Sequence, residues 1–224
     1  AFRDSGWFKL DAPGSTHVMM ADFRADPVAN PLATPSGKIE IWSETIAGFG
    51  YDDCAPHPTW YEPPEWLGSA DRGTRLHLLG HQPTARLHSQ LDHGAVSRDA
   101  KINGHEPVKI NPQDAAARDI KDGDIVRLWN SRGSCLCGAI VSDVVMPGVL
   151  IVSTGAWFDP DPQAGIGCKH GNPNVLAPDR GTSKLAQGPA AHSCLVDIER
   201  WVGPAVSVTA HNPPMIETMK TRHK

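Results

Sequence analysis

Asp124-Ile-Val-Arg-Leu-Trp-Asn-Ser-Arg-Gly133 is the stretch of this chain that decides its fold class. Residues 124–130 alternate in character, as expected for a strand with one buried face. The next three residues form a turn, residues 134–145 return the chain, and Pro147-Gly148 turns it again before residues 149–152. Three strands at near-regular spacing, joined by tight turns, predict a closed or nearly closed β-barrel.

Shorter patterns on either side of this stretch add to the same sheet. Residues 75–79 and 108–110 alternate as strands, and Pro112 suits the first position of a short helix that continues to Arg118. A last strand at 193–198 places Cys194, Val196 and Ile198 on one face. We therefore expect a mainly β fold with short helices.

The first 71 residues differ from the rest of the chain in proline content and in the near absence of strand-like alternation. Repeated prolines interrupt them, and only Gly37-Lys-Ile-Glu-Ile-Trp-Ser43 alternates as a strand, with an extension toward Ile46. This segment lacks the apolar residues for a core of its own, so we expect it to pack against something else. The tail from residue 204 to residue 224 is weakly patterned.

Composition excludes several classes of protein. The net charge of −4 lacks the basic excess that is typical of nucleic-acid-binding proteins. No apolar run approaches the roughly 18 residues of a membrane span. The five cysteines are an odd, scattered set, which favours reduced thiols over a disulfide framework. Cys135 and Cys137 are expected on the same face of a strand. The chain begins with Ala1 rather than Met, so further sequence is expected upstream.

Two polar loops carry the candidate chemistry. The first, residues 80–90, follows a strand, and Gln82, Arg86 and Gln90 offer donors for a phosphate or a planar heterocycle. In the second, residues 168–176, Asn174 could start a helical turn whose free N–H groups face an anion. Each loop also has a simpler interpretation: a solvated loop with a local Arg86 salt bridge, and ordinary capping and turn chemistry.

A zinc site is the main rival hypothesis. Candidate ligands are His77, His81, His88, His93, Cys168, His170 and His192. No Cys-x-x-Cys spacing occurs, and His77 and His81 lie on a strand pattern rather than a helix. No Gly-x-Ser-x-Gly elbow supports a hydrolase either. The sequence therefore predicts neither a metal ligand nor a catalytic residue in this chain.

Four stretches resemble the C-terminal part of the dimethyl-sulfoxide-reductase family of molybdenum enzymes, in its biotin sulfoxide and trimethylamine-N-oxide reductase branches. They are residues 34–43, the loop 82–90, Gly155-Ala-Trp157, and residues 170–176 together with 181–188. The resemblance implies a double-psi β-barrel over residues 72–203, preceded by the end of another domain at 1–71. It also implies a molybdenum bis(molybdopterin guanine dinucleotide) cofactor shared with missing N-terminal domains.

The same resemblance implies the cofactor contacts. Gln82 and His88 would contact the dinucleotide from the first loop, and Asn174 from the second. The remaining candidates are Arg86, Ser89, Gln90, Asn172, Gln187 and His192. His192 stands where the family is expected to have Gln, which leaves its role open.

By this resemblance, the chain is part of a reductase of small S-oxides or N-oxides and is inactive as an isolated fragment. The rest of the parent reductase would supply the molybdenum ligand and the substrate funnel. The likeness to biotin sulfoxide reductase favours the cytoplasm over the periplasm. The alternative is a stand-alone barrel that acts as a binding or assembly module without catalysis.

Overall fold

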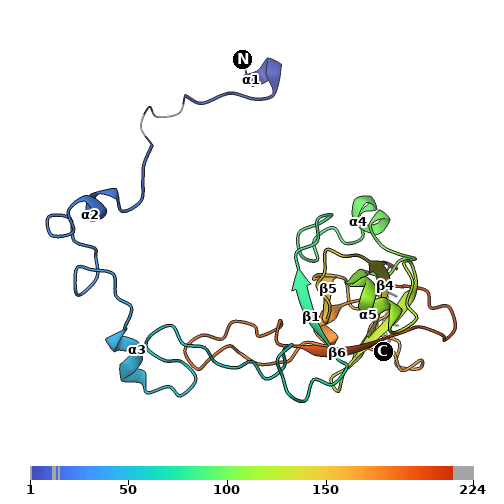
Figure 1. Cartoon of the computed structure of the whole chain (residues 1–224). Helices are drawn as coiled ribbons and strands as arrows, with labels where there is room; N and C mark the ends of the chain where they lie inside the picture. Colours follow the sequence, from blue (N-terminus) through green and yellow to red (C-terminus); the bar gives the residue numbers. More distant parts are fainter. Residues whose placement is uncertain (1, 12–13, 15, 214–224) are drawn as a thin grey trace, which may run out of the picture. The chain divides into compact units, whose positions relative to one another are not determined.

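The computed structural model describes residues 2–11, 14 and 16–213, which form two compact units, Ala1–Trp60 and Tyr61–Lys224 (Figure 1). The first unit has three short helices: α1 (Phe2–Ser5), α2 (Ala21–Ala25) and α3 (Glu44–Phe49). No described residue up to Trp60 is buried, so this segment has no core of its own.

The strand expected at residues 37–46 is wrong. Ile39 and Ile41 are 67% and 74% exposed, and no strand lies beside them in the described part of the first unit. The Ser43 hydroxyl instead accepts a hydrogen bond from the N–H of Ile46 at 3.3 Å and caps α3. Alternation alone cannot make a strand where no neighbour satisfies its backbone.

The second unit contains a closed barrel of six strands (Figure 1). The strands are β1 (Leu76–His81), β2 (Pro107–Ile110), β3 (Ile125–Trp129), β4 (Ser134–Val141), β5 (Val149–Ser153) and β6 (Leu195–Arg200). Their order is β1-β5-β2-β4-β3-β6; β1 and β5 are parallel, as are β2 and β4, and the other neighbours are antiparallel. The predicted mainly β, double-psi barrel class is confirmed.

The β3–β4 hairpin supplies much of the barrel core, as its alternation predicted. Val126 and Leu128 are fully buried and stand opposite Cys137 and Cys135. The two cysteines lie on the same face with their sulfur atoms 3.9 Å apart, and all five cysteines are free thiols. The prediction that Cys135 and Cys137 share one face of a strand is therefore confirmed.

Three short helical segments connect the strands. They are α4 (Ala95–Asp99), α5 (Pro112–Ala116) and the 3-10 turn η1 (Pro173–Val175). The side chain of Asn111 accepts a hydrogen bond from the N–H of Gln113 at 2.9 Å, so α5 begins at Pro112 as expected. The helix is two residues shorter than expected, and β4 ends at Val141 rather than 145.

The compact barrel unit begins at Tyr61, eleven residues before the boundary drawn from the sequence. Glu65 explains the difference, because its carboxylate pairs with Arg132 at 2.6 Å and accepts the N–H of Leu195 at 2.7 Å. Ser193 donates to the carbonyl of Glu65 at 3.0 Å, so β6 starts two residues later than expected. Residues 204–213 of the tail are described, and residues 214–224 lie outside the described residues.

In the described part of the chain, the helices are all too short to cross a bilayer.

Leu128→Ala should lower the free energy of unfolding by about 2–5 kcal/mol, because Leu128 is fully buried in the barrel core and its loss leaves a cavity. Urea unfolding of the chain measures this change. Leu10→Ala is the matched control, since Leu10 is 77% exposed and should change stability by less than about 0.5 kcal/mol. Equal losses in the two variants would contradict the assigned core.

Candidate functional site

The two polar loops meet at one end of the barrel, around a hollow of about 450 Å³. We call it the polar hollow. Its lining comes from the loop after β1, the segment after β5 and the η1 turn: His88, Ser89, Gly155, Ala156, Trp157, Phe158, Asn172 and Asn174. Residues more than 80 positions apart in the sequence thus share one recess. Four of the nine candidate residues are among them.

The first loop lies in close contact with the segment after β5. His88 and Gly155 both have positive φ, 49° and 88°. A Cβ on Gly155 would stand 2.1 Å from the carbonyl oxygen of His88, so only glycine fits there. The indole N–H of Trp157 donates to the carbonyl of Ser89 at 2.9 Å. These contacts fix the backbone of the loop at the rim of the polar hollow.

Gln82 is joined to the polar hollow through His88. Its side-chain nitrogen lies 3.0 Å from Nδ1 of His88, although Gln82 itself is not part of the lining. Both side chains are exposed, so their polar atoms remain accessible to a bound molecule. Asn174 is also exposed, and its backbone N–H donates to the side-chain oxygen of Asn172 at 2.9 Å. Asn172 therefore caps η1, as the simpler interpretation of that loop expects.

Arg86 lies beneath the loop and not in the polar hollow. Its side chain is 2% exposed, and its guanidinium donates to the carbonyls of His88 at 3.0 Å and Thr154 at 2.9 Å. The same group pairs with Asp92 at 3.3 Å and Glu106 at 3.1 Å. Arg86 thus ties the loop to the end of β5, and its own donors are already used.

Lys101 completes a buried group of four charges with Arg86, Asp92 and Glu106, which we call the charge cluster. Its ammonium nitrogen lies 2.9 Å from Asp92 and 2.7 Å from Glu106, and all four side chains are at most 2% exposed. Two cations and two carboxylates sum to zero. Because unpaired charges are very costly to bury, each member requires the others.

The electrostatics of Asp92 follow from this pairing. Burial acts to raise its pKa, but the hydrogen bond and charge of Lys101, together with the backbone N–H of Trp157, hold that pKa far below its ordinary range. The N–H of Trp157 donates to Asp92 at 3.1 Å. Asp92 is therefore a permanent carboxylate directly behind the polar hollow, and it positions Trp157.

His170 also lies behind the polar hollow and is fully buried. Burial, and then the charge of Lys101, lower its pKa to about 4. Its Nδ1 lies 3.0 Å from the carbonyl oxygen of Trp157, which as an acceptor requires the proton on that nitrogen. At neutral pH His170 is therefore a neutral imidazole with its lone pair on Nε2.

Besides Gln82 and Arg86, three further candidate residues lie outside the lining of the polar hollow. Gln90 is exposed, and its backbone closes a turn with Leu87 at 2.9 Å. The side chain of Gln187 donates to the carbonyl of Ser183 at 2.8 Å. Nδ1 of His192 accepts the N–H of Gly80 at 3.3 Å. The structure therefore does not bring these side chains together with His88 and Asn174.

Sequence reasoning missed the residues that support the polar hollow. Asp92, Lys101 and Glu106 look like ordinary surface charges in the sequence, because nothing local shows that a loop will bury them. Trp157 belonged to a quoted motif but was not assigned to the site. His211, which lies 3.2 Å from Asp92, comes from the weakly patterned tail. Only the fold shows these residues together.

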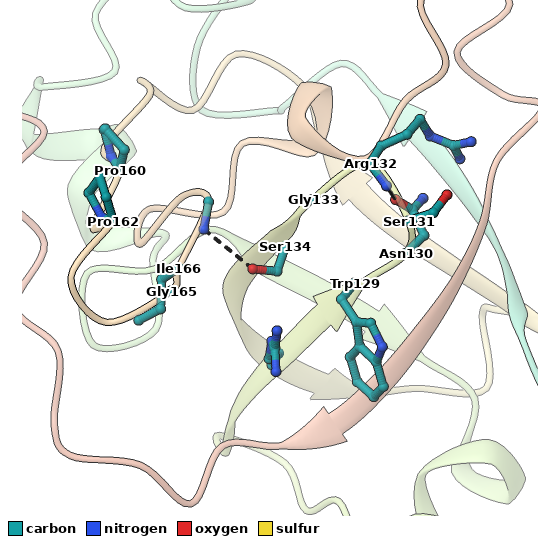
Figure 2. Close-up of a pocket in the computed structure, with 12 residues that line it drawn as sticks. Trp129, Asn130, Ser131, Arg132, Gly133, Ser134, Pro160, Pro162, Gly165 and Ile166 are labelled. Carbon is teal, nitrogen blue, oxygen red and sulfur yellow. Dashed lines mark hydrogen bonds between the residues drawn. The ribbon is translucent and has the colours of Figure 1, made fainter.

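A second hollow of about 450 Å³ lies between the turn after β3 and the loop 160–167 (Figure 2). It contains none of the candidate residues. Its two arginines are engaged elsewhere: Arg132 pairs with Glu65 at 2.6 Å, and Arg127 lies 3.8 Å from Glu199. Ser134 accepts the N–H of Gly167 at 3.3 Å across it.

Comparison with known proteins agrees with the fold. Residues 76–195 match the family described as Molydopterin dinucleotide binding domain. The chain is 52% identical over 204 residues to a dimethyl sulfoxide/trimethylamine N-oxide reductase of Cereibacter sphaeroides, and 52% identical over 189 residues to a biotin sulfoxide reductase of the same organism. These alignments cover 90% and 84% of the chain but 25% of each relative. The chain thus spans about a quarter of the length of these relatives.

Among solved structures, acetylene hydratase from Pelobacter acetylenicus superposes with a TM-score of 0.59 at 19% identity. The match covers 79% of this chain and 25% of that one. A likeness at this identity concerns the fold alone.

Arg86→Met should lower the free energy of unfolding by about 3–5 kcal/mol, because it leaves Asp92 and Glu106 buried with one cation between them. Arg127→Met is the control: that arginine and its partner Glu199 are 35% and 51% exposed, so its loss should cost about 1 kcal/mol or less. Urea unfolding measures both. A loss for Arg86→Met no larger than the control's would contradict the assigned charge cluster.

Stability should fall as the pH drops from about 6.5 toward about 4. The unfolded chain takes up a proton on His170 at its ordinary pKa of about 6.5, whereas the folded state keeps that residue neutral until about 4. His170→Gln should flatten this part of the curve in urea unfolding at a series of pH values in metal-free buffer. Parallel curves for the two proteins would show that His170 carries no such linkage.

Proposed function

Because the chain belongs to the Molydopterin dinucleotide binding domain family, we propose that it binds a molybdenum bis(molybdopterin guanine dinucleotide) in the polar hollow. It would do so as the C-terminal part of an S-oxide or N-oxide reductase. The convergence of the 80–90 loop and the η1 loop carries this proposal. Sequence identity of 52% to two such reductases supports the proposal that this chain is part of a reductase of that kind.

The chemistry of the lining fits a pterin nucleotide. Asn172 and Asn174 offer amides, Ser89 a hydroxyl and His88 an imidazole, which can bond to ring nitrogens, ribose hydroxyls and phosphate oxygens. Trp157 and Phe158, 36% and 58% exposed, add aromatic surface for a planar ring. The lining contains no Lys or Arg side chain, so phosphates would be bound here by neutral donors.

The candidate residues divide into two roles. His88, Ser89, Asn172 and Asn174 would contact the dinucleotide directly, and Gln82 would contact it beside His88. Arg86 would act as a positioning residue, since it holds the carbonyl of His88 and has no free donor for a ligand. Gln90, Gln187 and His192 would then shape the surrounding loops.

The cofactor would supply the oxygen-atom and electron transfer, while this chain binds and orients it. The parent's missing domains would provide the molybdenum ligand and the substrate funnel. The first unit, in which none of the described residues is buried, would pack against those domains. The domain boundaries at 71/72 and 203/204 remain predictions. The alternative of a stand-alone barrel has no observation in its favour.

The test is a chimera in which this chain replaces the matching quarter of the Cereibacter sphaeroides biotin sulfoxide reductase. The double variant Gln82→Ala/His88→Ala should purify with clearly less molybdenum by elemental analysis. Each lost buried hydrogen-bond partner costs about 1–3 kcal/mol, or about ten- to a hundred-fold in affinity. Asn174→Ala alone should give a smaller loss.

Gln113→Ala, an exposed residue on α5, is the control and should retain full molybdenum content. Normal molybdenum in the double variant, together with an intact fold by circular dichroism, would overturn the assignment of the polar hollow.

A further inference from the structure

Three side chains behind the polar hollow have the composition and spacing of a metal site: Asp92, His170 and His211. One ligand atom from each lies within 4.8 Å of the others. They come from distant parts of the chain, since Asp92 lies before α4, His170 before η1 and His211 in the C-terminal segment. Two imidazoles and one carboxylate are a common ligand set for zinc.

His170 gives an independent indication. It is fully buried, and within the part of the chain that the structure describes its Nε2 has no hydrogen-bond partner. Buried polar atoms without partners are rare in folded proteins and call for an unseen ion or water. Its Nδ1 is anchored 3.0 Å from the carbonyl of Trp157. A metal-bound histidine is typically held in this way, with its other ring nitrogen donating to a backbone carbonyl.

Asp92 is similarly oriented. Its Oδ1 faces the charge cluster, 2.9 Å from Lys101 and 3.3 Å from Arg86, and accepts the Ser97 hydroxyl at 3.2 Å. Its Oδ2 faces the two histidines, 3.2 Å from Nε2 of His211 and 3.7 Å from Nδ1 of His170. Oδ2 also accepts the backbone N–H of Trp157 at 3.1 Å, so one further lone pair of this oxygen remains for an ion beside the two histidines.

The ligand atom of His170 would be Nε2, because Nδ1, the atom 3.7 Å from Asp92, donates to Trp157. The rings of His170 and His211 lie close together, with their centroids 4.9 Å apart. Ligand atoms around a tetrahedral zinc, with bonds of about 2.0–2.2 Å, lie roughly 3.3 Å apart. His211 and Asp92 already meet that spacing. The side chain of His211 is 16% exposed, so it can adjust and also offers an entry path. The fourth position of such a site would hold water.

We propose that Asp92, His170 and His211 bind one zinc ion. This ion joins the C-terminal segment to the barrel beneath the polar hollow. The segment is already seated there, because Thr209 and Ala210 donate their backbone N–H groups to Asp159 at 2.6 Å and 3.1 Å. The metal joins this segment to the loop of Asp92 and the loop of His170. The nearby positive charges of Lys101 and Arg86 oppose a second cation, so the affinity is moderate.

The test uses the complete 224-residue chain, stripped of metal by a chelator and titrated with zinc alone. Isothermal titration and equilibrium dialysis should give one zinc per chain, and zinc should raise the melting temperature because it binds the folded state. Cobalt in its place should give the intense visible absorption of a four-coordinate site. No molybdopterin is present, so this result is independent of the proposed cofactor function.

His211→Gln is the decisive variant, since His211 lies in the C-terminal segment outside the six barrel strands and its replacement should leave the barrel folded. It should lower zinc affinity by about tenfold or more and remove the shift in melting temperature. His93→Gln is the matched control: His93 is exposed, its ring centroid lies 5.4 Å from that of Trp157, and it is outside the ligand set. It should bind zinc as the original chain does.

Failure of the original chain to bind zinc, or equal affinity in the His211→Gln and original chains, would overturn the proposal. Equal loss in His93→Gln would do so as well, because it would show adventitious binding by surface histidines.

Discussion

The pairing of Arg86 and Lys101 with Asp92 and Glu106 is the interaction on which the site depends. Four charges at most 2% exposed can be buried only because each carboxylate contacts both cations. The cluster then uses its remaining donors and acceptors on the backbone: Arg86 holds the carbonyl of His88, and Asp92 holds the N–H of Trp157. A loop with few apolar residues thus becomes a rigid wall of the polar hollow.

The barrel supplies the second half of this arrangement. Closure of the six strands places the end of β1, the end of β5 and the turn η1 at one rim. Gly155 allows the backbone of His88 to approach more closely than any side chain would permit. Rigid strands therefore define the position of the rim, and the charge cluster defines the conformation of the loop on it. Such preorganisation is what a large, many-contact ligand requires.

Local patterns were sufficient for most of the barrel and for part of the site. The alternation in residues 124–130 identified β3 because Val126 and Leu128 face a continuous core. The same pattern at Ile39 and Ile41 failed because no strand among the described residues lies beside them. Loop composition, with the family resemblance, pointed to His88 and Asn174. Charge pairs such as Lys101 with Glu106 could not be found, since their burial is a property of tertiary structure. The same holds for His211, which has no pattern around it.

Structure determination of the proposed parent reductase with a molybdopterin dinucleotide bound tests the central claim most directly. We predict that the nucleotide lies in the polar hollow, with His88 and Asn174 within hydrogen-bond distance of its polar atoms and Arg86 still enclosed by Asp92 and Glu106. A nucleotide seated instead in the hollow between Trp129 and Ile166, with His88 and Asn174 facing solvent, would contradict it.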